Sequence, residues 1–209
     1  MPTTSQWIAF LVASILFIQV PGPSLLFTIG RALTVGRRDA LLSVAGNGLG
    51  ITTQVVLIAV GLDAVVTASS TAYAAVKVVG ATYVIWLGVQ AIRHRADARA
   101  AMAARVKSGG RGKSLRTGFV VGVTNPKTIV FFVAFLPQFV DASAGHVGLQ
   151  MSVLGLAFGV MAICSDTIWA LAASKARDWF ARKPDRLDRL GATGGVMMVG
   201  LGATMLTQD

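Results

Sequence analysis

Residues 43–50 read S-V-A-G-N-G-L-G, and residues 152–159 read S-V-L-G-L-A-F-G. Two further matches occur in the same order: Gly80-Ala81-Thr82 with Gly191-Ala192-Thr193, and Pro23 with Pro126. The matching positions lie 103 to 111 residues apart. The chain is therefore predicted to consist of two related halves.

Apolar runs long enough to cross a hydrocarbon core of about 30 Å lie near residues 7–29, 40–62, 72–92, 117–139, 148–173 and 190–207. Helices are the expected spanning element, because barrel strands would be shorter and would alternate in polarity. Each half then crosses the membrane three times. Because three is odd, the second half starts on the opposite side. The expected fold is an all-α integral membrane protein with six transmembrane helices in two inverted three-helix repeats.

Composition places the chain in lipid. Of 209 residues, 54% are hydrophobic and 13% are charged, whereas a soluble domain carries about 25% charged residues. The net charge of +10 would also suit a nucleic-acid partner, but the placement of the charges argues against one. The lone Cys164 excludes an internal disulfide.

Basic residues gather in alternate connections. Seventeen of the 19 Lys and Arg residues follow the first, third and fifth apolar runs, and the intervening connections hold Asp63 and Asp141 without Lys or Arg. The positive-inside rule then places these three loops in the cytoplasm and both termini outside it. The predicted domains are a first repeat (1–92), a basic cytoplasmic linker (93–116) and a second repeat (117–209).

Prolines interrupt two apolar runs at corresponding positions. The first run contains Gln19-Val20-Pro21-Gly22-Pro23-Ser24 and the fourth contains Thr124-Asn125-Pro126-Lys127. Proline removes a backbone donor, so the freed carbonyls need partners from protein or from a wet cavity. Such paired interruptions indicate a transport site, with two purely structural kinks as the alternative. With the intramembrane Asn47 added, the candidate transport residues are Gln19, Pro21, Gly22, Pro23, Asn47, Asn125, Pro126 and Lys127.

Two charged residues lie deep in predicted spans. Lys127 is about 16 Å beyond Arg116, and Asp166 is about 13 Å before Lys175, at the rise of a helix. The two side chains are therefore candidates for an ion pair that fixes helix packing. Alternatively, Lys127 receives a substrate carboxylate and Asp166 receives an amine or a proton, which makes Asp166 the candidate for proton coupling.

Other polar and small residues carry less specific signals. Asn47 and Gln54 are two helical turns apart and share a face. Gly46 and Gly50, like Gly155 and Gly159, form small-xxx-small pairs that favour close helix packing. No cluster of His, Cys or acidic residues has ligand spacing, and no nucleophile–base arrangement stands out. Neither a metal site, a cofactor nor an enzymatic activity is expected.

The motifs resemble the LysE/RhtB family of lysine exporters and homoserine/threonine efflux translocators. The resemblance covers essentially the whole chain and rests on Pro21-Gly22-Pro23, Gly46, Gly50, Gly80-Ala81-Thr82-Tyr83, Trp86-Leu87-Gly88, Asn125-Pro126-Lys127 and Phe135-Leu136-Pro137-Gln138-Phe139. It implies a bacterial inner-membrane exporter of amino acids or close analogues, driven by proton antiport. Asp166 is not part of these motifs, and its role is inferred from its depth.

Alternatives stay open at this point. An exporter of cations or of other small metabolites could share this fold, and a non-transporting membrane scaffold is a third hypothesis. The expected partners are the lipid bilayer, a small-molecule substrate and protons, and glycine-rich helix faces are compatible with a homodimer. The motifs leave the substrate unidentified.

Overall fold

The computed structural model describes residues 1–68, 70–93, 111–176, 179, 182–183 and 185–207, and all regular elements among them are helical. The all-α prediction is therefore confirmed for these residues. In chain order the elements are α1 (Thr4–Gln19), α2 (Pro23–Thr34), α3 (Arg37–Ala68), α4 (Ser70–Arg93), α6 (Arg111–Val123), α7 (Pro126–Val130), the π-helix η1 (Phe131–Phe135), the 3₁₀-helices η2 (Leu136–Phe139) and η3 (Ala142–Ala144), α8 (Val147–Lys175) and α10 (Asp185–Thr207).

Three of the described segments are long and apolar enough to cross a membrane: Arg37–Ala59, Gly112–Phe139 and Val147–Lys175. The bent pair of α1 and α2 supplies a fourth if it is taken as one span. α4 and α10 are 24 and 23 residues long, which matches the length that a bilayer core of about 30 Å requires. The count of six spans stays a prediction.

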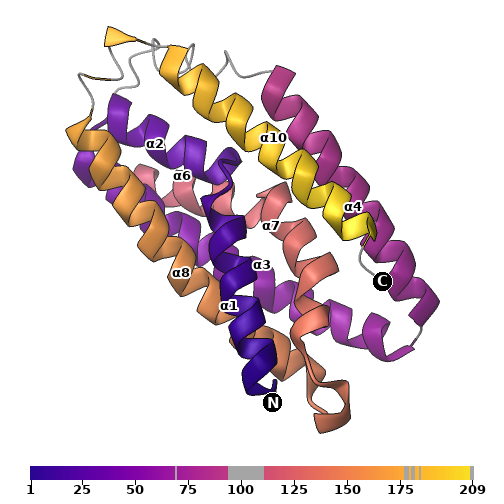
Figure 1. Cartoon of the computed structure of the whole chain (residues 1–209). Coiled ribbons are helices and arrows are strands. Elements are labelled where there is room, and N and C mark those ends of the chain that lie inside the picture. The colour runs from indigo at the N-terminus through magenta and orange to yellow at the C-terminus, as the bar shows by residue number, and fades with distance from the viewer. Residues whose placement is uncertain (69, 94–110, 177–178, 180–181, 184, 208–209) are drawn as a thin grey trace.

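The helices run in alternating directions along one bundle (Figure 1). The N-terminus and the turn between α3 and α4 lie at one end, and α8 starts at this end and runs away from it. α10 returns toward this end beside α4. Segments far apart in the sequence are therefore neighbours across the bundle.

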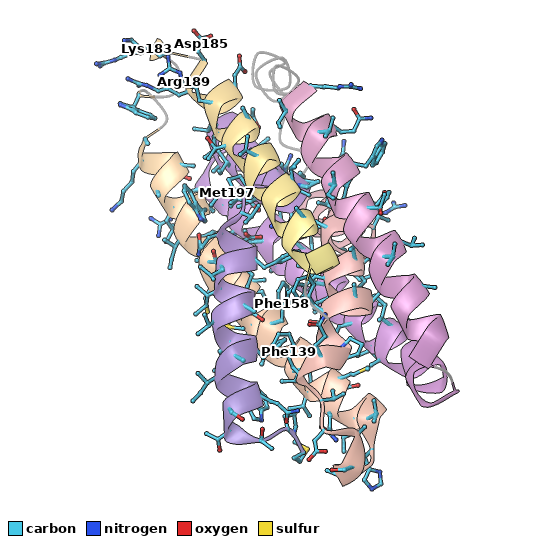
Figure 2. The ribbon with its side chains drawn as sticks, turned by 45° about the vertical axis from the view of Figure 1, so that its right-hand side comes forward. Phe139, Phe158, Lys183, Asp185, Arg189 and Met197 are labelled. Atoms are coloured by element: carbon cyan, nitrogen blue, oxygen red, sulfur yellow. The ribbon has the colours of Figure 1, made fainter. Side chains whose placement is uncertain are left out.

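Charged and apolar side chains lie at different levels along the bundle. Lys183, Asp185 and Arg189 gather at one end, whereas Phe139 and Phe158 lie well below them (Figure 2). The outward faces between the ends carry large apolar side chains, and each of Ile8, Leu16, Leu57 and Ile168 is at least 59% exposed. Helices that are apolar on their outer faces as well as their inner ones are suited to lipid.

Glycines bring α3 and α6 into backbone contact. A Cβ added at Gly46 would lie 2.0 Å from the carbonyl oxygen of Leu115, and one added at Gly118 would lie 2.0 Å from that of Ser43. Gly50 and Gly122 repeat the contact one turn along. The packing role predicted for Gly46 and Gly50 is confirmed, and α6 contributes a matching pair that the sequence analysis missed.

A polar cluster ties the end of α2 to α3 and α6. The Arg31 guanidinium donates to the hydroxyl of Ser114 at 2.7 Å and to that of Ser43 at 3.2 Å. Ser114 in turn donates to the carboxylate of Asp39 at 2.7 Å. Arg31 lies in the last turn of α2 and thus anchors this helix to α3 and α6.

Two connections differ from the prediction. α6 begins at Arg111, so residues 111–116, which were assigned to the linker, are helical; residues 94–110 lie outside the described residues. The connection after α2 is only Val35-Gly36. Gly36 has a φ of +94°, which glycine adopts without steric penalty, so Arg37 and Arg38 already start α3.

The glycine contact predicts an asymmetric effect of alanine substitutions in α3. Gly46→Ala should destabilise the protein by about 1–3 kcal/mol, because the added methyl group forces α3 and α6 apart. Gly61→Ala is the matched control, since a Cβ at Gly61 meets nothing within 4 Å. Thermal unfolding in detergent measures both. Equal melting temperatures for the two variants would contradict the contact.

Candidate functional site

The first proline interruption separates two helices. α1 ends at Gln19 and α2 starts at Pro23 with Gly22 as its N-cap, and the two helices meet at an angle of 51°. Proline suits the first turn of a helix, where its missing N–H would have no intrahelical partner. The interruption that the sequence predicts in the first apolar run is thus a complete break between two helices.

Lys127 replaces the hydrogen bond that Pro21 cannot make. In a continuous helix the N–H of residue 21 would donate to the carbonyl of Phe17, but proline has no N–H. The Lys127 ammonium donates instead to the carbonyl oxygens of Phe17 and Val20, both at 2.6 Å. A cation is also favourable at the C-terminal end of α1 because of the helix dipole.

Glycine at position 22 leaves space for this lysine. A Cβ at Gly22 would lie 2.7 Å from Cδ of Lys127. The ammonium also lies 4.3 Å from the centre of the Phe17 ring, where a cation–π attraction adds to the hydrogen bonds. Lys127 therefore joins the second broken helix to the first.

Gln54 performs the same task at the second break. Pro126 cannot donate to the carbonyl of Gly122, four residues earlier. The side-chain amide of Gln54, from α3, donates to the carbonyl oxygens around this break: Gly122 at 3.4 Å, Val123 at 2.9 Å and Asn125 at 3.3 Å. A buried side chain from a neighbouring helix thus satisfies the end of α6.

The start of α7 is fixed by local contacts. The Asn125 side chain accepts from the backbone N–H of Lys127 at 3.1 Å, which is an N-cap. The Thr128 hydroxyl contacts Oε1 of Gln54 at 2.6 Å. These contacts set the direction in which Lys127 leaves the helix.

Asp166 has its own set of partners on the other side of the site. One carboxylate oxygen, Oδ2, accepts from the Asn47 amide at 3.0 Å and from the Thr28 hydroxyl at 3.4 Å. The same Asn47 amide nitrogen lies 2.6 Å from the hydroxyl of Ser24. Asp166, from α8, is therefore tied to α2 and α3.

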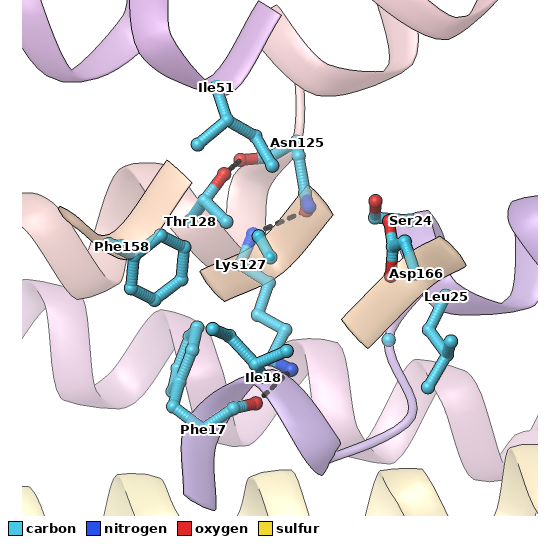
Figure 3. Close-up of a pocket in the computed structure, with 12 residues that line it drawn as sticks. Phe17, Ile18, Ser24, Leu25, Ile51, Asn125, Lys127, Thr128, Phe158 and Asp166 are labelled. Atoms are coloured by element: carbon cyan, nitrogen blue, oxygen red, sulfur yellow. Dashed lines mark hydrogen bonds between the residues drawn. The ribbon is translucent and has the colours of Figure 1, made fainter. Parts of the chain in front are cut away.

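A small cavity lies between these two groups (Figure 3). Its volume is about 30 Å³, enough for about two waters and far below the several hundred cubic ångströms of a typical ligand pocket. The polar part of its lining comprises Ser24, Asn125, Lys127, Thr128 and Asp166. The site is therefore contracted in this structure.

Lys127 and Asp166 line the same cavity without bonding each other. Lys127 donates to backbone carbonyls and Asp166 accepts from an amide and a hydroxyl, and the described contacts include no hydrogen bond between the two. In Figure 3 Lys127 points toward Phe17, away from Asp166. The geometry favours separate roles over a structural ion pair.

The other sequence-predicted residues divide into two groups. Gly22 and Asn125 line the cavity, and Asn47 contacts two of its lining residues. Gln19 instead bonds Ser165 and Trp169 of α8, each at 3.1 Å, outside the cavity. Pro21 packs against α10, and Pro23 and Pro126 start α2 and α7.

Sequence reasoning missed four polar residues of the site: Ser24, Thr28, Gln54 and Thr128. Ser24 and Thr28 follow the first break at a spacing of four, which puts them on one face of α2. Gln54 shares a face with Asn47, and this was the available signal for its role. Among the described residues no three His, Cys, Asp or Glu side chains lie close enough together to hold a metal ion.

Comparison with known proteins agrees with these features. The sequence profile of LysE type translocators matches residues 15–209. The chain belongs to the LysE type translocator family. The resemblance noted from the motifs is thereby confirmed, and the family consists of translocators rather than enzymes.

Curated relatives match this translocator over nearly its full length. A Vibrio cholerae protein described as an uncharacterized membrane protein is 34% identical over 202 residues, 96% of each chain. A homoserine/homoserine lactone efflux protein of Salmonella typhimurium is 30% identical, covering 97% of each chain. A leucine efflux protein of Klebsiella pneumoniae is 26% identical, covering 97% of this chain and 95% of its own. No solved structure matches.

The role of Gln54 generates a prediction about donors. Gln54→Glu keeps the size of the side chain but removes its N–H donors, so the carbonyl of Val123 loses the donor described for it, whereas those of Gly122 and Asn125 keep backbone donors. Each buried unsatisfied group costs about 1–3 kcal/mol, so the melting temperature in detergent should fall clearly. Thr53→Ala, at an exposed neighbour bonded only within α3, should leave it unchanged. An unaltered melting temperature for Gln54→Glu would show that the amide is dispensable.

Proposed function

We propose that this translocator exports amino acids or close analogues across the bacterial inner membrane by proton antiport. The observation that carries the proposal is the meeting of two broken helices at one polar cavity, which contains Lys127 and Asp166. Secondary transporters place their substrate sites at discontinuous helices near the membrane midplane. The names of the efflux relatives support a small amino compound as the substrate.

The proposed architecture is a pair of inverted three-helix repeats. Two observations support it: the alternating helix directions in Figure 1, and the placement of Pro23 and Pro126 at the start of the second part of each broken helix. The segments 1–92 and 117–209 would then rock against each other, with 93–116 joining them on the cytoplasmic side and both termini outside. A homodimer remains compatible with this arrangement.

The named compounds of the relatives share one chemical group. Homoserine and leucine carry an amine and a carboxylate, whereas homoserine lactone keeps the amine and has its carboxyl group closed into a ring. The amine is the cationic feature that all three have in common. Asp166 is the acidic residue in the cavity lining and therefore the natural partner for it.

Competition for one carboxylate provides the coupling in this proposal. Asp166 can hold a proton or a substrate ammonium, but each displaces the other. A proton arriving from outside neutralises the carboxylate and releases the ammonium, and deprotonation toward the cytoplasm restores the site. Lys127 is the other charged residue in the cavity lining.

Opening of the cavity has an identifiable gate. An amino acid exceeds the present volume of about 30 Å³, so α1 and α2 must move relative to α7. The hydrogen bonds of Lys127 to Phe17 and Val20 span that gap. Alternating access then requires these bonds to lengthen or to exchange.

Counterflow and efflux in proteoliposomes loaded with a labelled amino-acid mixture test the proposal. One or a few amino acids should leave selectively, and external acid should accelerate the loss. Asp166→Asn should abolish this acceleration. Asp141→Asn should keep it, because the Ser143 hydroxyl lowers the pKa of the partly exposed Asp141 carboxyl, which therefore stays ionised at neutral pH.

The outcomes separate the alternatives. Acid-accelerated loss that persists in Asp166→Asn would remove that residue from the coupling step. If a metal cation or an unrelated metabolite moves and no amino acid does, the protein exports that compound class instead of amino acids.

A further inference from the structure

We propose that the substrate is held by its primary ammonium group, in a subsite formed by Asn47, Asp166 and Ser24, and that a free substrate carboxylate is dispensable. This inference rests on the proposed export function and names the chemical group of the substrate that the cavity recognises.

The first argument is an acceptor without a donor. Oδ1 of Asn47 is buried and has no hydrogen-bond partner, and the residue is 1% exposed. A buried acceptor left unpaired destabilises a protein. A 180° rotation of the amide would lose the contacts of its nitrogen, which lies 2.6 Å from Ser24 Oγ and donates to Asp166 at 3.0 Å. Asn47 lies next to the cavity, since its amide contacts the lining residues Ser24 and Asp166, and a substrate donor bound between them would satisfy Oδ1.

The second argument is the spare capacity of the carboxylate. An ionised carboxylate accepts about four hydrogen bonds, and Asp166 receives two, both at Oδ2. Ser24 and Asp166 line the cavity side by side in Figure 3. A primary ammonium brings three donors and a positive charge, which suits two or three such acceptors.

The third argument is that Lys127, the cationic donor in the cavity lining, is already engaged. Lys127 has three N–H groups, and it already donates to two carbonyl oxygens at 2.6 Å and faces the Phe17 ring. Binding a substrate carboxylate would withdraw it from the end of α1, where Pro21 leaves a carbonyl without its helical partner. The other donors at the cavity, the Asn125 amide and the N–H groups at the start of α2, are uncharged and can bind a carboxamide or ester oxygen as well as a carboxylate.

The consequence is a defined substrate class. Small compounds with a free primary amine should enter whether their carboxyl group is ionised or blocked as an amide. Compounds whose amine is acetylated should be excluded, because the acetamide carries no charge and a single N–H donor.

Competition in wild-type proteoliposomes tests the inference. The labelled amino acid that moves in the mixture assay is challenged with an excess of its own amide or of its N-acetyl derivative. The amide should inhibit nearly as well as the unlabelled amino acid. The N-acetyl derivative should need a roughly tenfold or higher concentration for half-inhibition, since it loses a charged hydrogen-bonding group.

The results distinguish this inference from the export function. Inhibition by the N-acetyl derivative but not by the amide would overturn the ammonium subsite and leave amino-acid export intact. Absence of any amino-acid movement, by protein shown to be folded, would overturn the export function and the subsite with it.

An Asn47 variant adds a second readout. Asn47→Ala removes the unpaired acceptor, so KM should rise about tenfold for the amino acid and its amide alike, with a smaller change in maximal rate. Thr53→Ala, at an exposed position of the same helix, is the control. An unchanged KM in folded Asn47→Ala would exclude Asn47 from the subsite, and a loss confined to maximal rate would point to a merely structural role.

Discussion

The structure depends on carbonyl groups that lose their regular helical donor to a proline inside the membrane. Lipid offers no hydrogen bonds, so each such group must find a donor within the protein. Pro21 removes the regular helical donor to the carbonyl of Phe17, and Pro126 removes the one to Gly122. Each carbonyl keeps only a long bond from a nearer backbone N–H, that of Val20 at 3.2 Å and that of Asn125 at 3.3 Å. Lys127 and Gln54 supply further donors from other helices. These hydrogen bonds also join α7 to α1 and α3 to the end of α6. The polar cavity lies where these segments meet.

The sequence predicted the features that leave a direct mark in residue order. Apolar runs predicted the helices, and Pro21, Pro23 and Pro126 predicted the breaks. Lys127 and Asp166 were selected for their expected depth, and both line the cavity. The partners of these residues were not predictable, because Lys127 binds backbone carbonyls, which every residue possesses. Gln54 reaches a break roughly 70 positions away in sequence, and only the approach of α3 to α6 brings it there. Gln19 lies beside a break, but α1 directs its side chain away from the cavity and toward α8.

In this account the same contacts form the gate and border the binding site. The free energy of opening the cavity is therefore coupled to the free energy of binding the substrate. In the proposed cycle, substrate binding near Asp166 widens the space between α2 and α7. The hydrogen bonds from Lys127 to α1 then lengthen and weaken. Release of the substrate lets these bonds reform and contracts the cavity to the state seen here. A binding site with strong permanent contacts would resist this contraction, which agrees with the modest number of spare acceptors around Asp166.

Access to the cavity from each side of the membrane tests the central claim most directly. A Ser24→Cys variant in a Cys164→Ser background places one thiol at the cavity wall, since Cys164 is exposed and would otherwise react. The rate of modification by a membrane-impermeant cationic thiosulfonate is measured in right-side-out and inverted vesicles that retain transport. The account predicts modification from both faces, slowed by the transported amino acid. Modification from one face only, at a rate that the amino acid does not change, would contradict an alternating site at the helix breaks.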